Sequence, residues 1–384
     1  MTDAPKHWKP RTLAAQALGA HDRATQGVVP PVHVASTFIR DADNQYRSGF
    51  AYGRPDNATV RQAEAVIAAL EGSEHAMLFA SGMAAATAIV MALDPPAHIV
   101  APRVMYWALR RWLATDAIRY GYRVDFVDTS DLAALREAVR PGTTKLVWIE
   151  TPSNPLWSIT DIAAAASIAH DAGARLAVDS TVATPIFTRP LALGADIVMH
   201  SATKYLNGHS DVIAGALAAA SNNEFWARIT RLRSDQGAIL GPFEAWLLMR
   251  GLRTLDLRVR AQSDTAALLA TRLRHSDEIA DILYPGLPQH PGHEIAARQM
   301  QGFGAMLSIR VARGETAAIA AAGRVRLWKR ATSLGGVESL IEHRASVEGP
   351  GSPCPPDLLR LSVSLEDADD LFADLYQALR SGGG

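Results

Sequence analysis

Along the first half of the chain, segments whose apolar residues follow a helical spacing alternate with short, continuous apolar runs. This pattern predicts helices that alternate with strands. Between Asn57 and Leu70 the spacing is helical, and Gly72 is a typical stop signal. His75–Phe79 is a short apolar run that predicts a strand. An Ala-rich helix is expected to begin after Ser81-Gly82-Met83. The apolar positions of the first helix are Val60, Ala63, Val66, Ile67 and Leu70.

The same alternation continues toward residue 180. Strands are predicted at His98–Val100, Arg123–Val127, Lys145–Ile149 and Arg175–Val178. The helices between them are predicted at Tyr106–Tyr120, Asp131–Val139 and Asp161–Ala172. Because strands separated by helices of this length usually pair in parallel, we expect a three-layer α/β domain with right-handed crossovers.

The two ends of the chain follow different patterns. Residues 1–55 show little periodicity and several prolines, which predicts an arm that contributes to a neighbouring subunit. Glu244–Leu273 predicts one or two long helices with a break near Gly251. The domain that follows mixes strands with helices, at Ala305–Val311, Thr316–Ala322, Leu359–Val363 and Ala368–Leu379. We therefore expect an arm (1–55), a large α/β domain (56–245) and a smaller C-terminal α+β domain (246–384).

Composition narrows the class of partner. The 384 residues include 48% hydrophobic residues, and 38 basic side chains balance 39 acidic ones, so no charge excess points to nucleic acid or a membrane surface. Apolar runs such as Ala84–Leu93 are too short to span a bilayer, and Met1–Arg11 lacks a signal-peptide core. The single cysteine, Cys354, excludes an internal disulfide and a cysteine-based metal cluster. We expect a cytoplasmic protein without a metal that acts on a small molecule.

Lys204 is the candidate for chemistry. It follows an apolar run and lies among small and hydroxyl residues, which suits an amine that must lose its proton and attack a carbonyl carbon. Pyridoxal phosphate (PLP) enzymes use such a lysine as a Schiff base. A lone lysine at a strand end is far more often a solvated surface residue, so the hypothesis depends on its neighbours. His200 and His209 flank it at a spacing that suits no common metal motif, and we interpret both as structural.

These neighbours resemble the lysine signature of the trans-sulfuration (Cys/Met metabolism) PLP-dependent enzymes. The matching residues are Asp196, Ser201, Thr203, Lys204, Tyr205, Gly208 and His209. Further similar segments follow in order from about residue 27 to about residue 366. The resemblance implies PLP-dependent transferase fold type I, which is aspartate-aminotransferase-like, with pyridoxal 5'-phosphate as cofactor. It also implies a homotetramer, a dimer of dimers, whose active sites are shared between subunits.

Contacts to the cofactor phosphate are implied by three motifs. Ser81-Gly82-Met83 would present backbone N–H groups at a helix N-terminus. Ser201 and Thr203 match hydroxyls that serve the same group. Tyr52 and Arg54 match a Tyr-x-Arg element that reaches the phosphate of the adjacent subunit, where Arg54 would donate charge-assisted hydrogen bonds.

Contacts to the cofactor ring are implied by two further motifs. Asp179 ends an apolar strand at the sheet edge where α/β sites form, and a carboxylate there keeps the ring nitrogen protonated. Thr181 belongs to the same segment, in which Ser180 replaces the asparagine usual in the family. Tyr106 matches the family tyrosine that stacks on the ring and shuttles protons, so we assign catalysis to Lys204 and Tyr106.

Recognition of an amino-acid substrate is implied by four residues. Arg360 matches the family arginine that binds the α-carboxylate, and Ser333 matches the loop that faces it. Asn154, in Glu150-Thr-Pro-Ser-Asn-Pro155, matches an asparagine near the substrate carboxylate. Arg111 matches a further arginine close to the site.

The reaction itself is less sharply indicated. In family γ-synthases and γ-lyases that act on cystathionine, glutamate typically precedes the Ser-Leu-Gly-Gly loop, where this chain has Thr332. Methionine γ-lyases typically carry a cysteine where this chain has Ala108. Both differences favour a cystathionine β-lyase-like C–S cleavage that yields homocysteine, pyruvate and ammonia, although Leu334 replaces the aromatic residue common in β-lyases. Cystathionine γ-lyase, cystathionine γ-synthase and O-acyl-homoserine sulfhydrylase remain the alternatives.

Two other classes of protein fit the sequence less well. A nicotinamide-dependent dehydrogenase requires a Gly-x-Gly-x-x-Gly turn after an early strand, and the sequence contains none. A non-catalytic binding protein with a PLP fold would have less reason to keep Lys204, Asp179 and Arg360, all of which are present.

Overall fold

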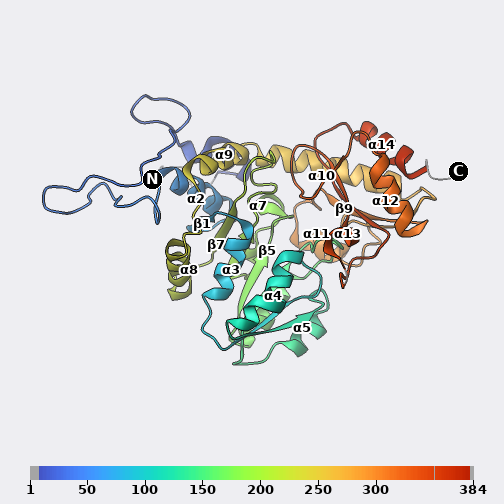
Figure 1. Cartoon of the computed structure of the whole chain (residues 1–384), viewed down its shortest axis with the longest axis horizontal. Coiled ribbons are helices and arrows are strands. Elements are labelled where there is room, and N and C mark those ends of the chain that lie inside the picture. The colour runs from blue at the N-terminus through green and yellow to red at the C-terminus, as the bar shows by residue number, and fades with distance from the viewer. Residues whose placement is uncertain (1–7, 350, 381–384) are drawn as a thin grey trace.

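A seven-stranded sheet forms the centre of the larger part of the molecule in the computed structural model, which describes residues 8–349 and 351–380 (Figure 1). Its strands are β1 (His75–Phe79), β2 (Ala97–Pro102), β3 (Tyr122–Val127), β4 (Thr144–Glu150), β5 (Arg175–Asp179), β6 (Ile197–His200) and β7 (Gly215–Ala219). They are arranged in the order β1-β7-β6-β5-β4-β2-β3. Only the two pairs that β7 makes, with β1 and β6, are antiparallel. The mainly parallel sheet that the sequence predicts is confirmed.

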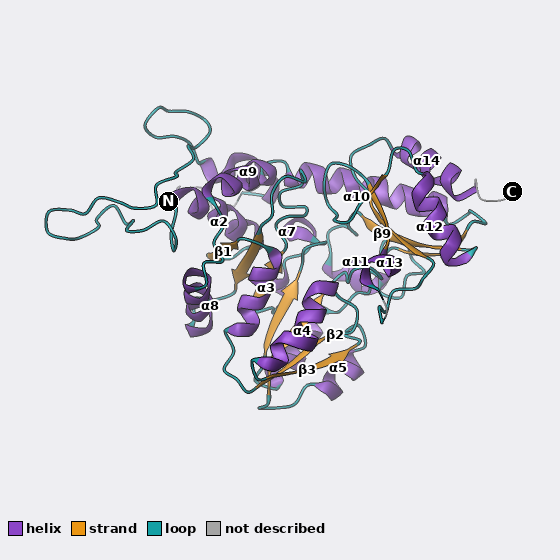
Figure 2. Cartoon of the chain, viewed as in Figure 1, coloured by secondary structure: helices purple, strands orange, loops and turns teal. Residues whose placement is uncertain are grey.

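Helices cover both faces of this sheet (Figure 2). They are α2 (Ala58–Glu71), α3 (Gly82–Met91), α4 (Trp107–Arg119), α5 (Leu132–Ala138), α6 (Ile162–Asp171), α7 (Thr184–Phe187) and α8 (Glu224–Asp235), with a 3₁₀ turn at Pro190–Leu193. Side chains of β4 alternate between the layers: Leu146 and Trp148 pack into the core under α3 and α4, and Val147 and Ile149 pack against α6. This double burial explains why the parallel strands are apolar throughout.

The helix α2 illustrates how local sequence sets an element. Its five predicted apolar positions are all buried. At its start the Asn57 side chain accepts hydrogen bonds from the backbone N–H groups of Thr59 and Val60. At its end Gly72 adopts φ = +73°, a left-handed conformation that glycine tolerates best.

A second sheet organises the C-terminal part. Its strands are β8 (Ile279–Leu283), β9 (Met306–Val311), β10 (Lys329–Arg330), β11 (Leu340–His343) and β12 (Leu358–Ser362), in the order β10-β11-β12-β9-β8. Only the β10–β11 pair is parallel. The helices of this part are α11 (His293–Gln299), α12 (Gly314–Arg324), α13 (Arg344–Glu348) and α14 (Ala368–Arg380). The mixture of strands and helices agrees with the predicted α+β domain.

Two helices link the parts: α9 (Pro242–Leu252) and α10 (Leu255–Leu273), which runs along the top of the molecule in Figure 1. The break between them falls at Arg253–Thr254, close to the predicted position at Gly251. Because α9 packs against α2, we propose that the large domain extends to this break rather than ending at residue 245. Within the described part of the chain, no helix combines the length and apolarity needed to cross a membrane.

The N-terminal segment is only partly extended. The helix α1 (Pro10–Gln16) and a 3₁₀ turn (Ala17–Gly19) pack on α2 and α10, because Leu13, Ala14 and Ala17 form an apolar face that becomes buried. Residues 20–56 then form two long loops that leave the body (Figure 1), and the chain returns to the body between them, where Trp246 donates to the Pro30 backbone oxygen and the His33 N–H donates to the Thr59 hydroxyl. The first seven residues of the predicted arm and the last four of the C-terminal domain lie outside the described residues. We propose that only the loops act as the arm.

Candidate active site

A cavity of about 240 Å³ lies where the carboxyl ends of β4, β5 and β6 meet the start of α3. This is the edge of a parallel sheet at which α/β proteins form their ligand sites. The predicted site residues that line it are Ser81, Gly82, Met83, Tyr106, Asn154, Asp179, Thr181, Ser201, Thr203 and Lys204. The fold thus brings together residues from five separate segments of the sequence.

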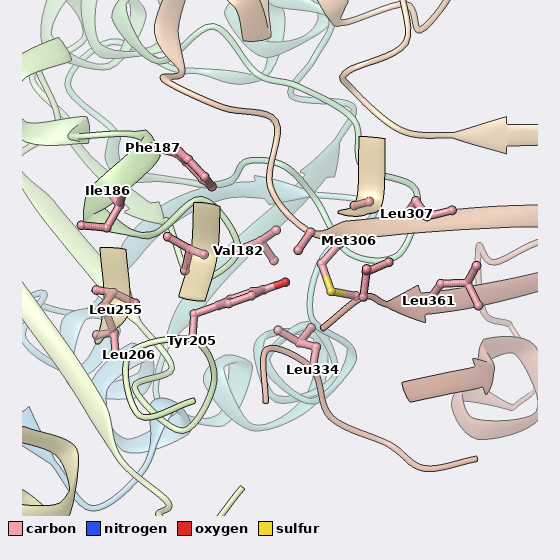
Figure 3. Close-up of a cluster of buried hydrophobic side chains, with 14 of the residues drawn as sticks. Val182, Ile186, Phe187, Tyr205, Leu206, Leu255, Met306, Leu307, Leu334 and Leu361 are labelled. Atoms are coloured by element: carbon pink, nitrogen blue, oxygen red, sulfur yellow. The ribbon is translucent and has the colours of Figure 1, made fainter. Parts of the chain in front are cut away.

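Lys204 is held in a turn that follows β6. The Thr203 hydroxyl donates to the backbone oxygen of Ala214 (3.1 Å) and accepts from its N–H (3.0 Å), which fixes the turn against the start of β7. Tyr205 is buried next to Val182, Met306 and Leu334, and Figure 3 shows its ring pointing among them. The lysine is therefore anchored on both sides by its neighbours in the sequence.

The amine of Lys204 lies in a setting that favours its neutral form. Its Nζ donates a hydrogen bond to the Ser333 hydroxyl at 2.8 Å. Burial, and then the positive charge of Arg360, lower the pKa of Lys204 to about 8. About a tenth of this amine is therefore unprotonated at pH 7, far more than for an ordinary lysine, and the unprotonated form is the one that a nucleophile or a base requires.

Ser333 holds Lys204 from an uncommon backbone conformation, with φ = +100°. The loop that carries it is fixed by packing: a Cβ added at Gly335 would lie 2.9 Å from the Tyr205 ring, so only glycine allows this approach. Ser364 is buried, and its hydroxyl donates to the backbone oxygen of Gly336 in the same loop. The serine thus adds a tether to this loop.

Asp179 is buried, and one of its two carboxylate oxygens is hydrogen-bonded within the chain. Its Oδ1 accepts hydrogen bonds from the Thr181 backbone N–H (3.0 Å) and hydroxyl (2.6 Å). The Thr181 hydroxyl in turn accepts from the Ser201 N–H (2.8 Å), which ties β5 to the lysine segment. Burial raises the pKa of Asp179, and a cationic ligand in the cavity would stabilise its ionised form.

The opposite end of the cavity suits an anion. The Ser81 hydroxyl accepts from the Ala84 N–H (3.1 Å) and caps α3, and the first N–H groups of a helix have no partner within it. Those of Gly82 and Met83 remain to serve a ligand. A Cβ at Gly82 would lie 3.0 Å from the Ser201 hydroxyl, so glycine allows the helix start and this hydroxyl to approach each other.

These features fit PLP. The start of α3 with Ser201 and Thr203 would hold its phosphate, Asp179 would pair with its protonated ring nitrogen, and Lys204 would bond its aldehyde carbon. This cofactor requires three groups: an anion site, a carboxylate that a cation would stabilise, and an amine with a lowered pKa. Within residues 8–349 and 351–380, no cluster of three His, Cys, Asp or Glu residues could hold a metal ion.

A second group of predicted residues adjoins the lysine. Arg360, buried in β12, donates from Nη1 to Asn154 Oδ1 (3.1 Å) and from Nη2 to the Ser333 backbone oxygen (2.9 Å). Because Ser333 also accepts from Lys204, these four residues form one hydrogen-bonded unit. A guanidinium in this place can bind a carboxylate beside the reactive amine.

Three predicted residues lie apart from the cavity in the single chain. Tyr52 is 49% exposed on the arm, and the Arg54 guanidinium lies over its ring at 5.5 Å from the ring centre. Arg111 is exposed on α4 and does not line the cavity. The roles of all three therefore stay predictions, and those of Tyr52 and Arg54 require a second subunit.

Glu150 is a site residue that the sequence reasoning missed. Its Oε2 accepts from the backbone N–H of Tyr106 (2.7 Å), and its Oε1 accepts from that of Asn154 (2.8 Å). Burial, and then the charge of Asp179, raise the pKa of Glu150 to about 8. The signal was available, because Glu150 ends the strand next to the one that Asp179 ends, and the two are register partners.

The histidines near Lys204 have structural partners. His200 is fully buried on the back of the sheet, where its Nε2 bonds to Glu71 at the end of α2. His209 Nδ1 bonds to the Asn207 backbone oxygen at 2.8 Å. Both contacts are consistent with the structural interpretation.

The fold and this donor set together define a PLP-dependent enzyme of fold type I. The comparisons narrow the class: residues 11–380 match the Cys/Met metabolism PLP-dependent enzyme family, and the chain belongs to it. It is 45% identical to a cystathionine gamma-synthase of Mycobacterium tuberculosis, over 96% of both chains. It is 40% identical to a cystathionine gamma-lyase of Bacillus subtilis, over 97% of this chain and all of the relative.

A solved structure agrees with these relatives. The cystathionine gamma synthase of Xanthomonas oryzae pv. oryzae in complex with cystathionine superposes with a TM-score of 0.92 at 37% identity, covering 97% of this chain and 98% of that one. The chain is therefore a PLP-dependent enzyme of trans-sulfuration, which confirms the family, the fold class and the cofactor that the sequence predicts.

Proposed function

We propose that this enzyme is a cystathionine γ-synthase, which joins the sulfur of cysteine to Cγ of an activated four-carbon amino acid. The 45% identity to a relative of that name, over 96% of both chains, is the observation that carries the proposal. A cystathionine γ-lyase is the second candidate, favoured by the 40% identity to the Bacillus subtilis relative.

The β-lyase reaction that the sequence favours is not retained. That prediction depended on Thr332 and Ala108, two single positions, whereas the relatives named γ-synthase and γ-lyase match the chain nearly from end to end. Thr332 is exposed, outside the unit that Lys204, Ser333 and Arg360 form, so it is poorly placed to decide the class of reaction.

The proposed chemistry divides between the cofactor and the chain. PLP, when bound, withdraws electrons from the substrate and makes its carbon-bound protons acidic enough to be removed. Lys204, with its lowered pKa, accepts and returns these protons, and reaction at Cγ requires transfers at both Cα and Cβ. Ser333 orients Nζ through its hydroxyl. Asp179 favours the electron-withdrawing, protonated form of the ring.

The substrate would be oriented by the remaining residues. Arg360 and Asn154 would bind the α-carboxylate, which places the substrate Cα within reach of Lys204. Tyr106, at the start of α4, would cover the cofactor ring and assist proton transfer to the leaving group.

Product analysis separates the candidate reactions. A γ-synthase supplied with cysteine and an O-acyl-homoserine should form cystathionine, whereas a sulfhydrylase should form homocysteine from the same ester and sulfide. With L-cystathionine alone, 2-oxobutyrate with cysteine indicates a γ-lyase, and pyruvate with homocysteine indicates a β-lyase. Cystathionine synthesis far slower than cleavage would overturn the γ-synthase assignment.

We further propose a cytoplasmic homotetramer in which the arm of one subunit completes the site of another. Its exposed apolar residues, among them Val28, Val34 and Ile39, gain a burial partner in this arrangement. Tyr52 and Arg54 would then reach the phosphate from outside the single chain.

Mixing two inactive variants tests the shared site. Arg54→Ala should weaken PLP retention, and Lys204→Ala should abolish turnover. When the two are refolded together, hybrid dimers contain one site with both residues, and about a quarter of wild-type activity should return. Each variant refolded alone is the control. If no activity returns although hybrids form, Arg54 does not act across the interface.

A further inference from the structure

Arg360 belongs to a buried ion-pair chain behind the substrate site. Its Nη2 donates to Glu342 Oε2 at 2.6 Å, and Glu342 lies opposite it on the neighbouring strand β11. Glu342 is 6% exposed and Arg360 is 4% exposed, so this pair is removed from water.

A second arginine binds the same carboxylate oxygen. Arg344, at the start of α13, donates from Nη1 to Glu342 Oε2 at 2.8 Å and from Nη2 to Glu348 Oε1 at 2.7 Å. Arg344 and Glu348 are also buried. The chain Arg360–Glu342–Arg344–Glu348 therefore contains two positive and two negative charges, and its formal charge is zero.

The zero formal charge of this ion-pair chain is important because Arg360 is proposed to bind one more anion, the substrate carboxylate. A buried carboxylate paired with Arg360 alone would neutralise the guanidinium and compete with the substrate. Arg344 pairs with the Glu342 carboxylate on the side away from the substrate site and balances its negative charge. Burial, and then the charge of Arg344, lower the pKa of Arg360 to about 10, so Arg360 still carries its charge at neutral pH.

We propose that Arg344 is a charge-balancing residue of the substrate site, which neutralises Glu342 and thereby keeps Arg360 available to the α-carboxylate. Arg360 bonds to Asn154 and Ser333 beside Lys204, whereas Arg344 bonds to Glu342 and Glu348 behind it, so Arg344 acts through Glu342 and Arg360 rather than by touching substrate. The inference rests on the proposed role of Arg360, but not on which trans-sulfuration reaction the enzyme performs.

Ligand binding to the holoenzyme tests this proposal without turnover. L-Norvaline and n-butylamine differ only in the carboxylate and carry no leaving group, and each can be titrated by the change in the visible absorbance of the cofactor. Arg344→Met should weaken norvaline at least about tenfold, or about 1.4 kcal/mol, and leave butylamine nearly unchanged. If both ligands weaken alike, or neither does, the proposal fails.

Two double variants separate charge balance from a merely structural role. Arg344→Met with Glu342→Gln and Arg344→Met with Glu348→Gln have the same net charge, but only the first removes the carboxylate that touches Arg360. The first should restore norvaline binding, and the second should not. Equal binding by both overturns the proposal. Because both are balanced in charge, they decide the question even if Arg344→Met alone does not fold.

Two controls complete the experiment. Arg310→Met removes an arginine of β9 that forms a bidentate ion pair with Asp357. This variant should bind both ligands as tightly as the wild type. Arg360→Ala should abolish the preference for norvaline over butylamine. If that preference survives, the proposed role of Arg360 is wrong; a failure confined to the double variants refutes Arg344 alone.

Discussion

Replacement of Lys204 by alanine is expected to remove turnover while PLP still binds, although more weakly. Removing a group that transfers protons typically costs about 10²–10⁴ in rate, and the proposed role of Lys204 also includes the covalent link to the cofactor. The start of α3, Ser201 and Asp179 remain to hold PLP without that link. Steady-state rates at saturating substrate and equilibrium dialysis of PLP measure the two effects separately.

The control for this variant is Lys145→Ala. Lys145 lies near the start of β4, outside the cavity lining, and its amine donates to the Gly142 backbone oxygen. Its replacement should therefore change neither the rate nor the binding of PLP. Borohydride reduction of the wild type followed by peptide mapping should place the pyridoxyl label on Lys204. A label elsewhere, or full activity of Lys204→Ala, would contradict the assignment.

Replacement of Asp179 by asparagine is expected to lower both PLP affinity and turnover. The amide keeps an oxygen for the two Thr181 bonds but carries no charge to hold the ring nitrogen protonated. Hydrogen bonds to charged groups contribute about 1.5–3 kcal/mol, so PLP affinity should fall about ten- to a hundredfold. Dialysis and activity at saturating PLP measure the two losses.

The apoprotein of this variant should behave differently. Burial raises the pKa of Asp179, which means that the ionised carboxylate is unfavourable in the folded apoprotein at neutral pH. Asp179→Asn should therefore melt no lower than the wild-type apoprotein, and a large loss of stability would show that Asp179 is structural instead. Asp161→Asn is the matched control, since asparagine can replace aspartate as the cap of α6.

The sequence predicts those features that depend on local pattern. The helix α2 has a helical apolar period between a capping asparagine and a terminating glycine, and each of these acts within a few residues. Asp179 could be placed because it ends an apolar strand, and parallel strands end at a common edge. Lys204 was found through the residues beside it.

Other features depend on contacts between distant segments. Strand β7 escaped prediction because Gly215-Ala-Leu-Ala-Ala219 lacks β-branched residues, and its strand structure comes from pairing with β1 and β6. Glu150 gains its role from two backbone N–H groups that only the folded chain brings to it. The ion pair of Arg360 with Glu342 likewise forms only when β11 and β12 pair.

The position of Glu150 gives the cavity an internal coupling. Its carboxyl group joins the backbone at Tyr106, which would cover the cofactor, to the backbone at Asn154, which would face the substrate. A ligand that displaced either backbone segment would therefore also displace the other through these two hydrogen bonds. If Tyr106 and Asn154 have the roles proposed for them, a substitution at Asn154 that alters substrate preference should therefore also alter the packing of Tyr106 on the cofactor ring.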